Sequence, residues 1–221
     1  MEISFGVSFN TVNYLTVYQI KEKAEQALSL VNYKNGEVDV EEICRSLNLT
    51  LVRSGKMIYD SDGNAVLGSL DFAGQTIRVN LHQNSNRERF TIAHEVGHLC
   101  LEHGKFLLSE TVVENDLYVE NNSKEIFNYQ RLEFQANIFA AELLLPDTQF
   151  RNTVEALREK YGTHGRSFGY IFVDDQPCNY VPYSQMLADL SELFGVSRRA
   201  IEIKLKRAGL VTDNRSSFTR A

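Results

Sequence analysis

The feature that most constrains this chain is an H-E-x-x-H motif at residues 94–98, inside a stretch that runs from residue 86 to 104. That stretch predicts a helix, with Ser85 or Asn86 as the N-cap and Gly104 after its end. Apolar residues fall on two of its faces, which is typical of a helix buried on both sides. The chain is therefore expected to fold around a helix that carries two histidines and a glutamate in its interior.

Histidines at this spacing project from one face a single turn apart, so both imidazoles can bind one metal ion. His94 and His98 are the expected ligands, and Glu95 is placed where it can accept a proton from an attacking water. Burying such groups costs several kcal/mol unless they are paired or ligated, which favours a metal site over a core histidine pair. Gly97 costs about 1 kcal/mol in a helix relative to alanine, which indicates a close approach by another segment.

The composition argues against several other classes of protein. Hydrophobic residues make up 43% of the 221 residues, enough for a core. No apolar run approaches the roughly 20 residues that a membrane-spanning helix needs, and the first residues lack the pattern of a secretory signal. The three cysteines are widely spaced and the net charge is −6. We therefore expect a cytoplasmic protein that is not a general nucleic-acid binder.

Upstream of the motif helix, the sequence predicts two helices and a small sheet. Apolar positions at helical spacing predict helices over residues 11–31 and 38–47. Residues 49–53 have the pattern of a strand, and residues 65–72 and 75–81 flank a short turn as a hairpin. The prediction is a small, mostly antiparallel sheet of about three strands, directly before the motif helix.

Downstream, the pattern becomes mainly helical. The acidic residues 105–122 are expected to form a surface loop, and residues 123–145 and 147–161 two helices. Residues 162–183 contain glycines and prolines and are expected to be a long connection, with a short strand at residues 167–173. The expected fold class is therefore α+β.

A catalytic zinc site needs a third protein ligand and one open coordination position. The metzincin pattern, with a further histidine six residues after the second one, fails because Gly104 occupies that position. His103 lies near the predicted helix end, so we expect it at the surface or against a carbonyl. The third ligand must therefore come from another element.

Glu133 is the favoured third ligand, because it shares a face of its predicted helix with small residues that permit close approach. Asn137, one turn later, is expected to hydrogen bond a ligand histidine and fix its ring. Glu133 can instead be a solvated charge on an amphipathic helix. The other candidate ligands are Glu142 and, less favoured, Glu125 and Glu102.

Two segments together resemble the ImmA/IrrE family of bacterial and phage metallopeptidases: FTIAHEVGHLCLEH at residues 90–103 and EFQANIFAAELLLP at residues 133–146. The methionine often found before the final proline is leucine here. The resemblance covers about residues 10–160. It implies a zincin-like, thermolysin-like zinc endopeptidase core, in which Glu95 is catalytic and the metal ligands are His94, His98 and Glu133.

The resemblance also implies a substrate, a helix-turn-helix transcriptional repressor whose cleavage releases stress genes or mobile-element genes. Peptide hydrolysis further needs a donor for the tetrahedral oxyanion. The sequence leaves five candidates for that donor open: Tyr129, Tyr161, His164, Tyr180 and Tyr183.

Residues 184–210 match a helix-turn-helix pattern, with a turn glycine at Gly195 and a second helix capped by Ser197. The second helix carries basic residues that suit DNA phosphates: Arg198, Arg199, Lys204, Lys206 and Arg207. The acidic remainder of the chain favours a packing or protein-docking role instead. The expected organisation is a metallopeptidase domain at 1–161, a connection at 162–183 and a helix-turn-helix-like segment at 184–221.

Two functions from different classes fit these features. The first is an intracellular zinc endopeptidase that cleaves a helix-turn-helix repressor. The second is a non-proteolytic regulatory protein that contacts a repressor or DNA through residues 184–210. The first is favoured, because a structural metal site has no need of Glu95 and is usually closed by four protein ligands.

Overall fold

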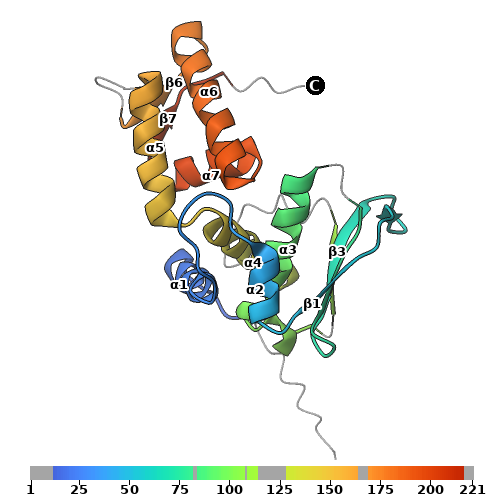
Figure 1. The fold of residues 1–221 in the computed structure, drawn as a ribbon. Coiled ribbons are helices and arrows are strands. Elements are labelled where there is room, and N and C mark those ends of the chain that lie inside the picture. The colour runs from blue at the N-terminus through green and yellow to red at the C-terminus, as the bar shows by residue number, and fades with distance from the viewer. Residues whose placement is uncertain (1–11, 82–83, 108, 114–127, 164–168, 217–221) are drawn as a thin grey trace, which may run out of the picture.

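The computed structural model has a mixed α+β fold in which helices pack beside a small sheet (Figure 1), as the sequence predicted. It describes residues 12–81, 84–107, 109–113, 128–163 and 169–216. The helices are α1 (Val17–Leu28), α2 (Val40–Ser46), α3 (Ser85–Cys100), the 3₁₀ turn η1 (His103–Lys105), α4 (Asn128–Leu144), α5 (Asp147–Tyr161), α6 (Pro177–Phe194) and α7 (Arg198–Arg207). The strands are β1 (Thr50–Arg53), β2 (Ile58–Tyr59), β3 (Ala65–Asp71), β4 (Thr76–Val79), β5 (Ser109–Val113), β6 (Ile171–Val173) and β7 (Val211–Asp213).

The main sheet has five strands, and it is mostly antiparallel. Its order is β1-β4-β3-β2, with β5 also paired to β3. The β1–β4 pair is parallel and the other pairs are antiparallel. Buried residues such as Leu70 on β3 and its partner Ile77 on β4 join the hydrophobic core. The sheet is therefore larger than the three strands expected from the sequence.

The fifth strand corrects the expectation of a loop at residues 105–122. Thr111, Val112 and Val113 of β5 are β-branched and pair with β3. The acidic residues around them obscured this short strand. The motif helix also ends earlier than expected, at Cys100, and a separate 3₁₀ turn follows at His103–Lys105.

Helix boundaries follow local capping. α1 begins at Val17 rather than near residue 11, because Thr16 and Gln19 form a reciprocal capping box. α5 has the predicted bounds, residues 147–161. α4 is described from Asn128 onward, so its predicted first residues, 123–127, lie outside the described part of the chain.

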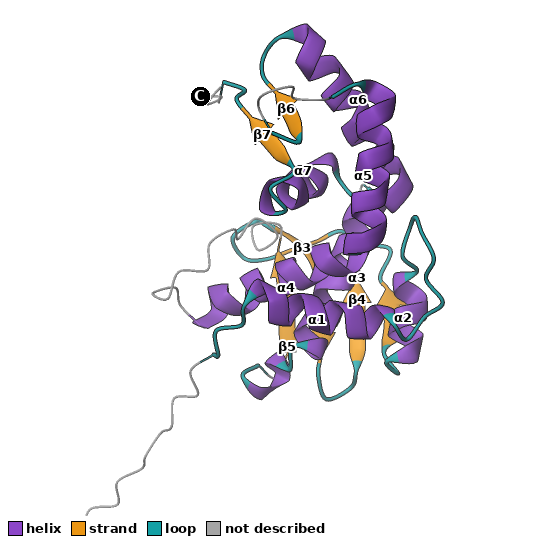
Figure 2. Ribbon diagram, turned by 90° about the vertical axis from the view of Figure 1, so that its left-hand side faces the viewer, coloured by secondary structure: helices purple, strands orange, loops and turns teal. Residues whose placement is uncertain are grey.

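α6 begins at Pro177, so residues 177–183 are helical rather than part of a connection. Pro177 stands at the first helical position, where its missing N–H would have no intrahelical partner. The segment at 167–173 contains the expected strand as β6, which pairs in parallel with β7 beside α6 and α7 (Figure 2). In the described residues, no helix has the length and apolar character needed to cross a bilayer.

The turn between α6 and α7 is held against the motif helix α3. The Arg89 guanidinium donates to the Gly195 carbonyl, at 3.2 Å, and to the Val38 carbonyl, at 2.8 Å. The Asn86 amide donates to the Val196 carbonyl at 3.1 Å. Gly195 has a φ of 61°, which favours glycine at this turn. The C-terminal helical pair therefore packs onto the element that carries the H-E-x-x-H motif.

Lys204, one of the basic residues whose charge suits DNA phosphates, is buried. Its side chain pairs with Glu142 of α4 and lies 3.8 Å from Asp147. Lys204 is 4% exposed and Glu142 9% exposed. Lys204 is therefore engaged inside the protein, in line with the favoured packing role of this segment, and Glu142, the alternative metal ligand, forms an ion pair between α4 and α7.

Replacing Lys204 with alanine is expected to lower the free energy of unfolding by about 3–5 kcal/mol, because it leaves the buried Glu142 carboxylate without its cation. Lys206→Ala is the matched control, since Lys206 is a neighbouring α7 lysine with a half-exposed side chain paired to Asp213. We expect the control to change stability by less than about 1 kcal/mol. Urea unfolding followed by circular dichroism measures both, and equal effects would contradict the role given to the buried pair.

Candidate metal centre

Helices α3 and α4 pack closely where the H-E-x-x-H motif lies. Residues from Thr91 to His98 on α3 are all buried. A Cβ atom built at Gly97 would lie 3.0 Å from Cδ1 of Phe139 on α4, tighter than ordinary contact. Gly97 therefore permits the close approach that the sequence indicated, and it brings α4 side chains against the two histidines.

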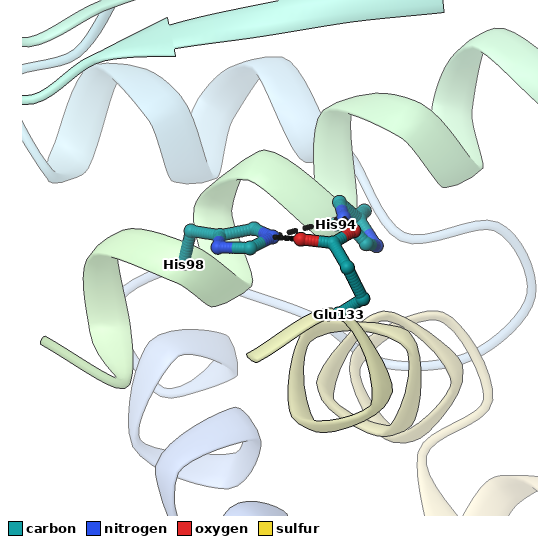
Figure 3. Close-up of side chains that lie close together, drawn as sticks. All are labelled: His94, His98 and Glu133. Carbon is teal, nitrogen blue, oxygen red and sulfur yellow. Dashed lines mark hydrogen bonds and ion pairs between the residues drawn. The ribbon is translucent and has the colours of Figure 1, made fainter. Parts of the chain in front are cut away.

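Three side chains converge between these helices (Figure 3). The Nε2 atoms of His94 and His98 are 2.9 Å apart. Glu133 of α4 places one carboxylate oxygen 3.1 Å from Nε2 of His94 and the other 3.4 Å from Nε2 of His98. All three side chains are fully buried. The structure thus brings together the three residues that the sequence nominated as ligands.

The arrangement fits a metal ion. Tetrahedral zinc ligands with bonds of about 2.0–2.2 Å lie roughly 3.3 Å from one another, close to the spacing here. Within the described residues, neither Glu133 carboxylate oxygen accepts a hydrogen bond, although both are buried. A buried carboxylate without donors is costly, and a cation shared with the imidazoles would offset that cost. Within the described part of the chain, His94, His98 and Glu133 form a group that could hold a metal ion.

The Nδ1 atom of each of these two histidines also has a hydrogen-bond partner. Nδ1 of His94 lies 2.9 Å from Oδ1 of Asn137, the contact expected from the spacing of Glu133 and Asn137 on one helix. Nδ1 of His98 lies 3.0 Å from Nδ1 of His103. Partners of this kind fix the orientation of a ligand ring.

His103 was expected at the surface or against a carbonyl; the surface location is wrong, whereas the contact with a carbonyl is found, to the side-chain amide of Gln135. His103 is 1% exposed and contacts both His98 and Oε1 of Gln135, the latter at 3.1 Å. The backbone of Glu102 has a φ of 61°, in the left-handed region, and leads from the end of α3 into η1, which begins at His103. A glutamate gives no sequence signal for this conformation, so the contact with His98 could not be foreseen.

Burial favours the neutral form of the His98 and His103 imidazoles. Burial, together with the neighbouring His94 and His103, lowers the pKa of His98 well below its usual range. Burial also lowers the pKa of His103 to about 4, although its hydrogen bond to Gln135 opposes the shift. Neutral imidazoles retain the lone pair that metal binding requires.

Glu95 is fully buried on the side of α3 that faces β3. A Cβ built at Gly68 of β3 would lie 2.8 Å from Cγ2 of Thr91 and 3.4 Å from Oε1 of Glu95. Gly68 therefore lets the sheet approach the motif glutamate. The sequence reasoning missed this residue, and a glycine inside a strand was the available signal.

The candidate oxyanion donors lie in different parts of the protein, and most are far along the chain from the three proposed ligands. Tyr161 donates to Asp189 at 2.7 Å, and Tyr183 is buried beneath Arg215, so both contact the C-terminal helices and their flanking residues. Tyr180 is exposed on α6. His164 lies outside the described residues. Tyr129 lies on α4 one turn before Glu133, so it is the candidate nearest the site along the chain.

The two weaker ligand candidates do not join the three-residue group. Glu102 is exposed and pairs with Lys105. Glu125 lies outside the described residues.

Comparison with known proteins agrees with this geometry. Residues 45–206 match the family model of the IrrE N-terminal-like domain. A protein named metallopeptidase ImmA from Bacillus subtilis (strain 168) is 29% identical over 133 residues, which cover 60% of this chain and 69% of that protein. A solved structure of a Mycobacterium tuberculosis transcriptional regulator has a TM-score of 0.50 and 17% identity, with 88% of this chain and 48% of that chain covered. This chain thus spans about half of that regulator, and the likeness concerns the fold.

Proposed function

Because this chain belongs to the ImmA/IrrE family of metallopeptidases, we propose that it is a cytoplasmic, zinc-dependent endopeptidase that cleaves a helix-turn-helix transcriptional repressor. The observation that carries the proposal is the convergence of three buried donors, from His94, His98 and Glu133, beside the motif glutamate. We assign these three residues as the zinc ligands, Glu95 as the general base and Asn137 as the residue that orients His94.

Zinc is the proposed metal because two imidazoles and one carboxylate are the donor set of thermolysin-like, or gluzincin, sites, which keep one coordination position open. When bound, zinc supplies Lewis acidity that polarises the scissile carbonyl and lowers the pKa of water. The zincin-like domain proposed for residues 1–161 supplies all of these side chains.

The protein's own groups carry the proton transfers. Glu95 accepts a proton from the attacking water and passes it to the leaving amine. Its complete burial strengthens this role, because charge interactions are stronger in a medium of low dielectric constant. The hydrogen bond between His94 and Asn137 holds the imidazole in a fixed orientation throughout.

The choice of a repressor as substrate rests on family membership. We propose that cleavage releases stress genes or mobile-element genes from repression. The helix-turn-helix-like pair α6–α7 then serves as a packing or protein-docking element. Its turn contacts Arg89 and Asn86 of α3, which makes DNA contact through that turn less favourable.

Incubation with a purified repressor tests this proposal. The zinc-loaded protein and its Glu95→Gln variant are mixed with the helix-turn-helix repressor encoded nearest its gene, and the products are analysed by intact mass. We expect two fragments with the wild type and intact repressor with the variant. An intact repressor after incubation with wild-type protein shown to contain zinc would contradict the proposed substrate.

A further inference from the structure

Among the described residues, one buried imidazole next to the candidate metal centre is not used by the proposed chemistry. His103 lies in η1, which follows the end of α3, with its Nδ1 atom 3.0 Å from Nδ1 of His98. Its Nε2 atom lies 3.1 Å from Oε1 of Gln135 on α4. Gln135 in turn donates from Nε2 to the backbone carbonyl of Asn13, at 2.9 Å. These four residues form a continuous chain of hydrogen bonds, which we call the His103 relay.

The donor and the acceptor at each contact of the relay can be assigned from its last member, the Asn13 carbonyl. The Asn13 carbonyl can only accept, so the Gln135 amide must point Nε2 toward it and Oε1 toward His103. Because Oε1 can only accept, His103 must carry its proton on Nε2. A neutral His103 then has its lone pair on Nδ1, and the proton in the contact with His98 must belong to Nδ1 of His98. Nε2 of His98 is left with a free lone pair.

That lone pair points where a metal would be bound. Nε2 of His98 lies 2.9 Å from Nε2 of His94 and 3.4 Å from a Glu133 carboxylate oxygen. The outer end of the relay is fixed as well, because Arg131 of α4 donates to the Val12 carbonyl at 2.8 Å, next to Asn13. A backbone carbonyl therefore determines, through two side chains, which nitrogen of His98 is available.

We propose that His103 is a positioning residue that sets the tautomer and ring orientation of His98 for metal binding. The inference rests on the proposed function, since it takes Nε2 of His98 as a metal ligand. Each histidine of the motif then has its own positioning partner. His94 uses the Asn137 amide directly, and His98 uses the His103 relay, which connects it to residues 12–13.

Two amide substitutions at the same position separate positioning from packing. In His103→Asn, the amide oxygen falls close to the place of the imidazole Nδ1 and can still accept from His98. In His103→Gln, the amide reaches the place of Nε2 and can still contact Gln135, but Nδ1 of His98 loses its acceptor. Both variants introduce a polar amide at the same buried position, so a role in packing alone predicts similar behaviour.

The zinc dissociation constant is measured by competition with a chromophoric chelator, together with the unfolding midpoint of each metal-free protein. We expect zinc binding within about threefold of wild type for His103→Asn, and about 10–100-fold weaker for His103→Gln. Long-range ¹H–¹⁵N NMR of the metal-free wild type is expected to show His98 protonated on Nδ1 and His103 on Nε2.

Equal zinc affinities in the two variants, or a His98 protonated on Nε2, would overturn the relay while leaving the proposed function intact. Failure of the wild-type protein to bind zinc would overturn the proposed function, and the relay with it. The wild-type measurement therefore distinguishes the two failures.

Discussion

Replacing Glu95 with glutamine is expected to lower kcat for peptide cleavage by roughly 10²–10⁴-fold, with zinc content unchanged. The amide has nearly the shape of the carboxylate, so it fits the buried space between α3 and β3. It has no basic oxygen that can take a proton from water. Single-turnover cleavage of the repressor, with zinc content measured by mass spectrometry, gives both quantities on the same preparation.

A glutamate outside the site provides the control for this experiment. Glu102 follows the motif helix, is exposed and pairs with Lys105, so Glu102→Gln should retain wild-type turnover. Turnover within threefold of wild type for Glu95→Gln, with zinc bound, would show that another group is the general base.

Replacing Glu133 with alanine is expected to remove the bound metal. The substitution deletes one of three protein donors and leaves two imidazole nitrogens, 2.9 Å apart, as the remaining ligands. We expect zinc affinity to fall by at least about 100-fold, the upper end of the loss that follows when only a supporting contact to a ligand is removed. Zinc content after dialysis and the chelator competition assay both measure this loss.

Glu142→Gln is the matched control on the same helix. The glutamine can still accept a hydrogen bond from the buried Lys204, whereas alanine would leave that lysine without its partner on α4. Zinc affinity should be unchanged in this variant. Retention of zinc by Glu133→Ala, or its loss in Glu142→Gln, would remove Glu133 from the proposed ligand set.

The sequence was sufficient to predict the family, the α+β class and the elements that carry the metal centre. The spacing within H-E-x-x-H places two imidazoles on one helical face, whatever the rest of the fold. Small residues beside Glu133 singled it out, because only a close helix pair brings a carboxylate to those imidazoles. In the structure, the two helices approach each other closely where Gly97 of α3 meets Phe139 of α4.

The features that the sequence did not reveal depend on contacts between distant residues or on unusual backbone conformations. His103 reaches His98 only because Glu102 adopts a left-handed conformation, which glutamate seldom does. Lys204 looks like a solvated charge in its own helix, and its burial depends on Glu142, 62 residues earlier. The first residues of helix α6, 177–183, were assigned to a connection because Pro177 is a helix breaker at most positions but suits the first one.

The most direct test of the metal centre is anomalous diffraction at the zinc edge from crystals of the zinc-loaded protein. The proposed ligand set predicts a peak about 2.0–2.2 Å from Nε2 of His94, Nε2 of His98 and a carboxylate oxygen of Glu133. The same map should show His103 in contact with His98 and outside the coordination sphere. A peak bound by other residues, or no peak between α3 and α4, would contradict a metal-dependent peptidase centred on these three side chains.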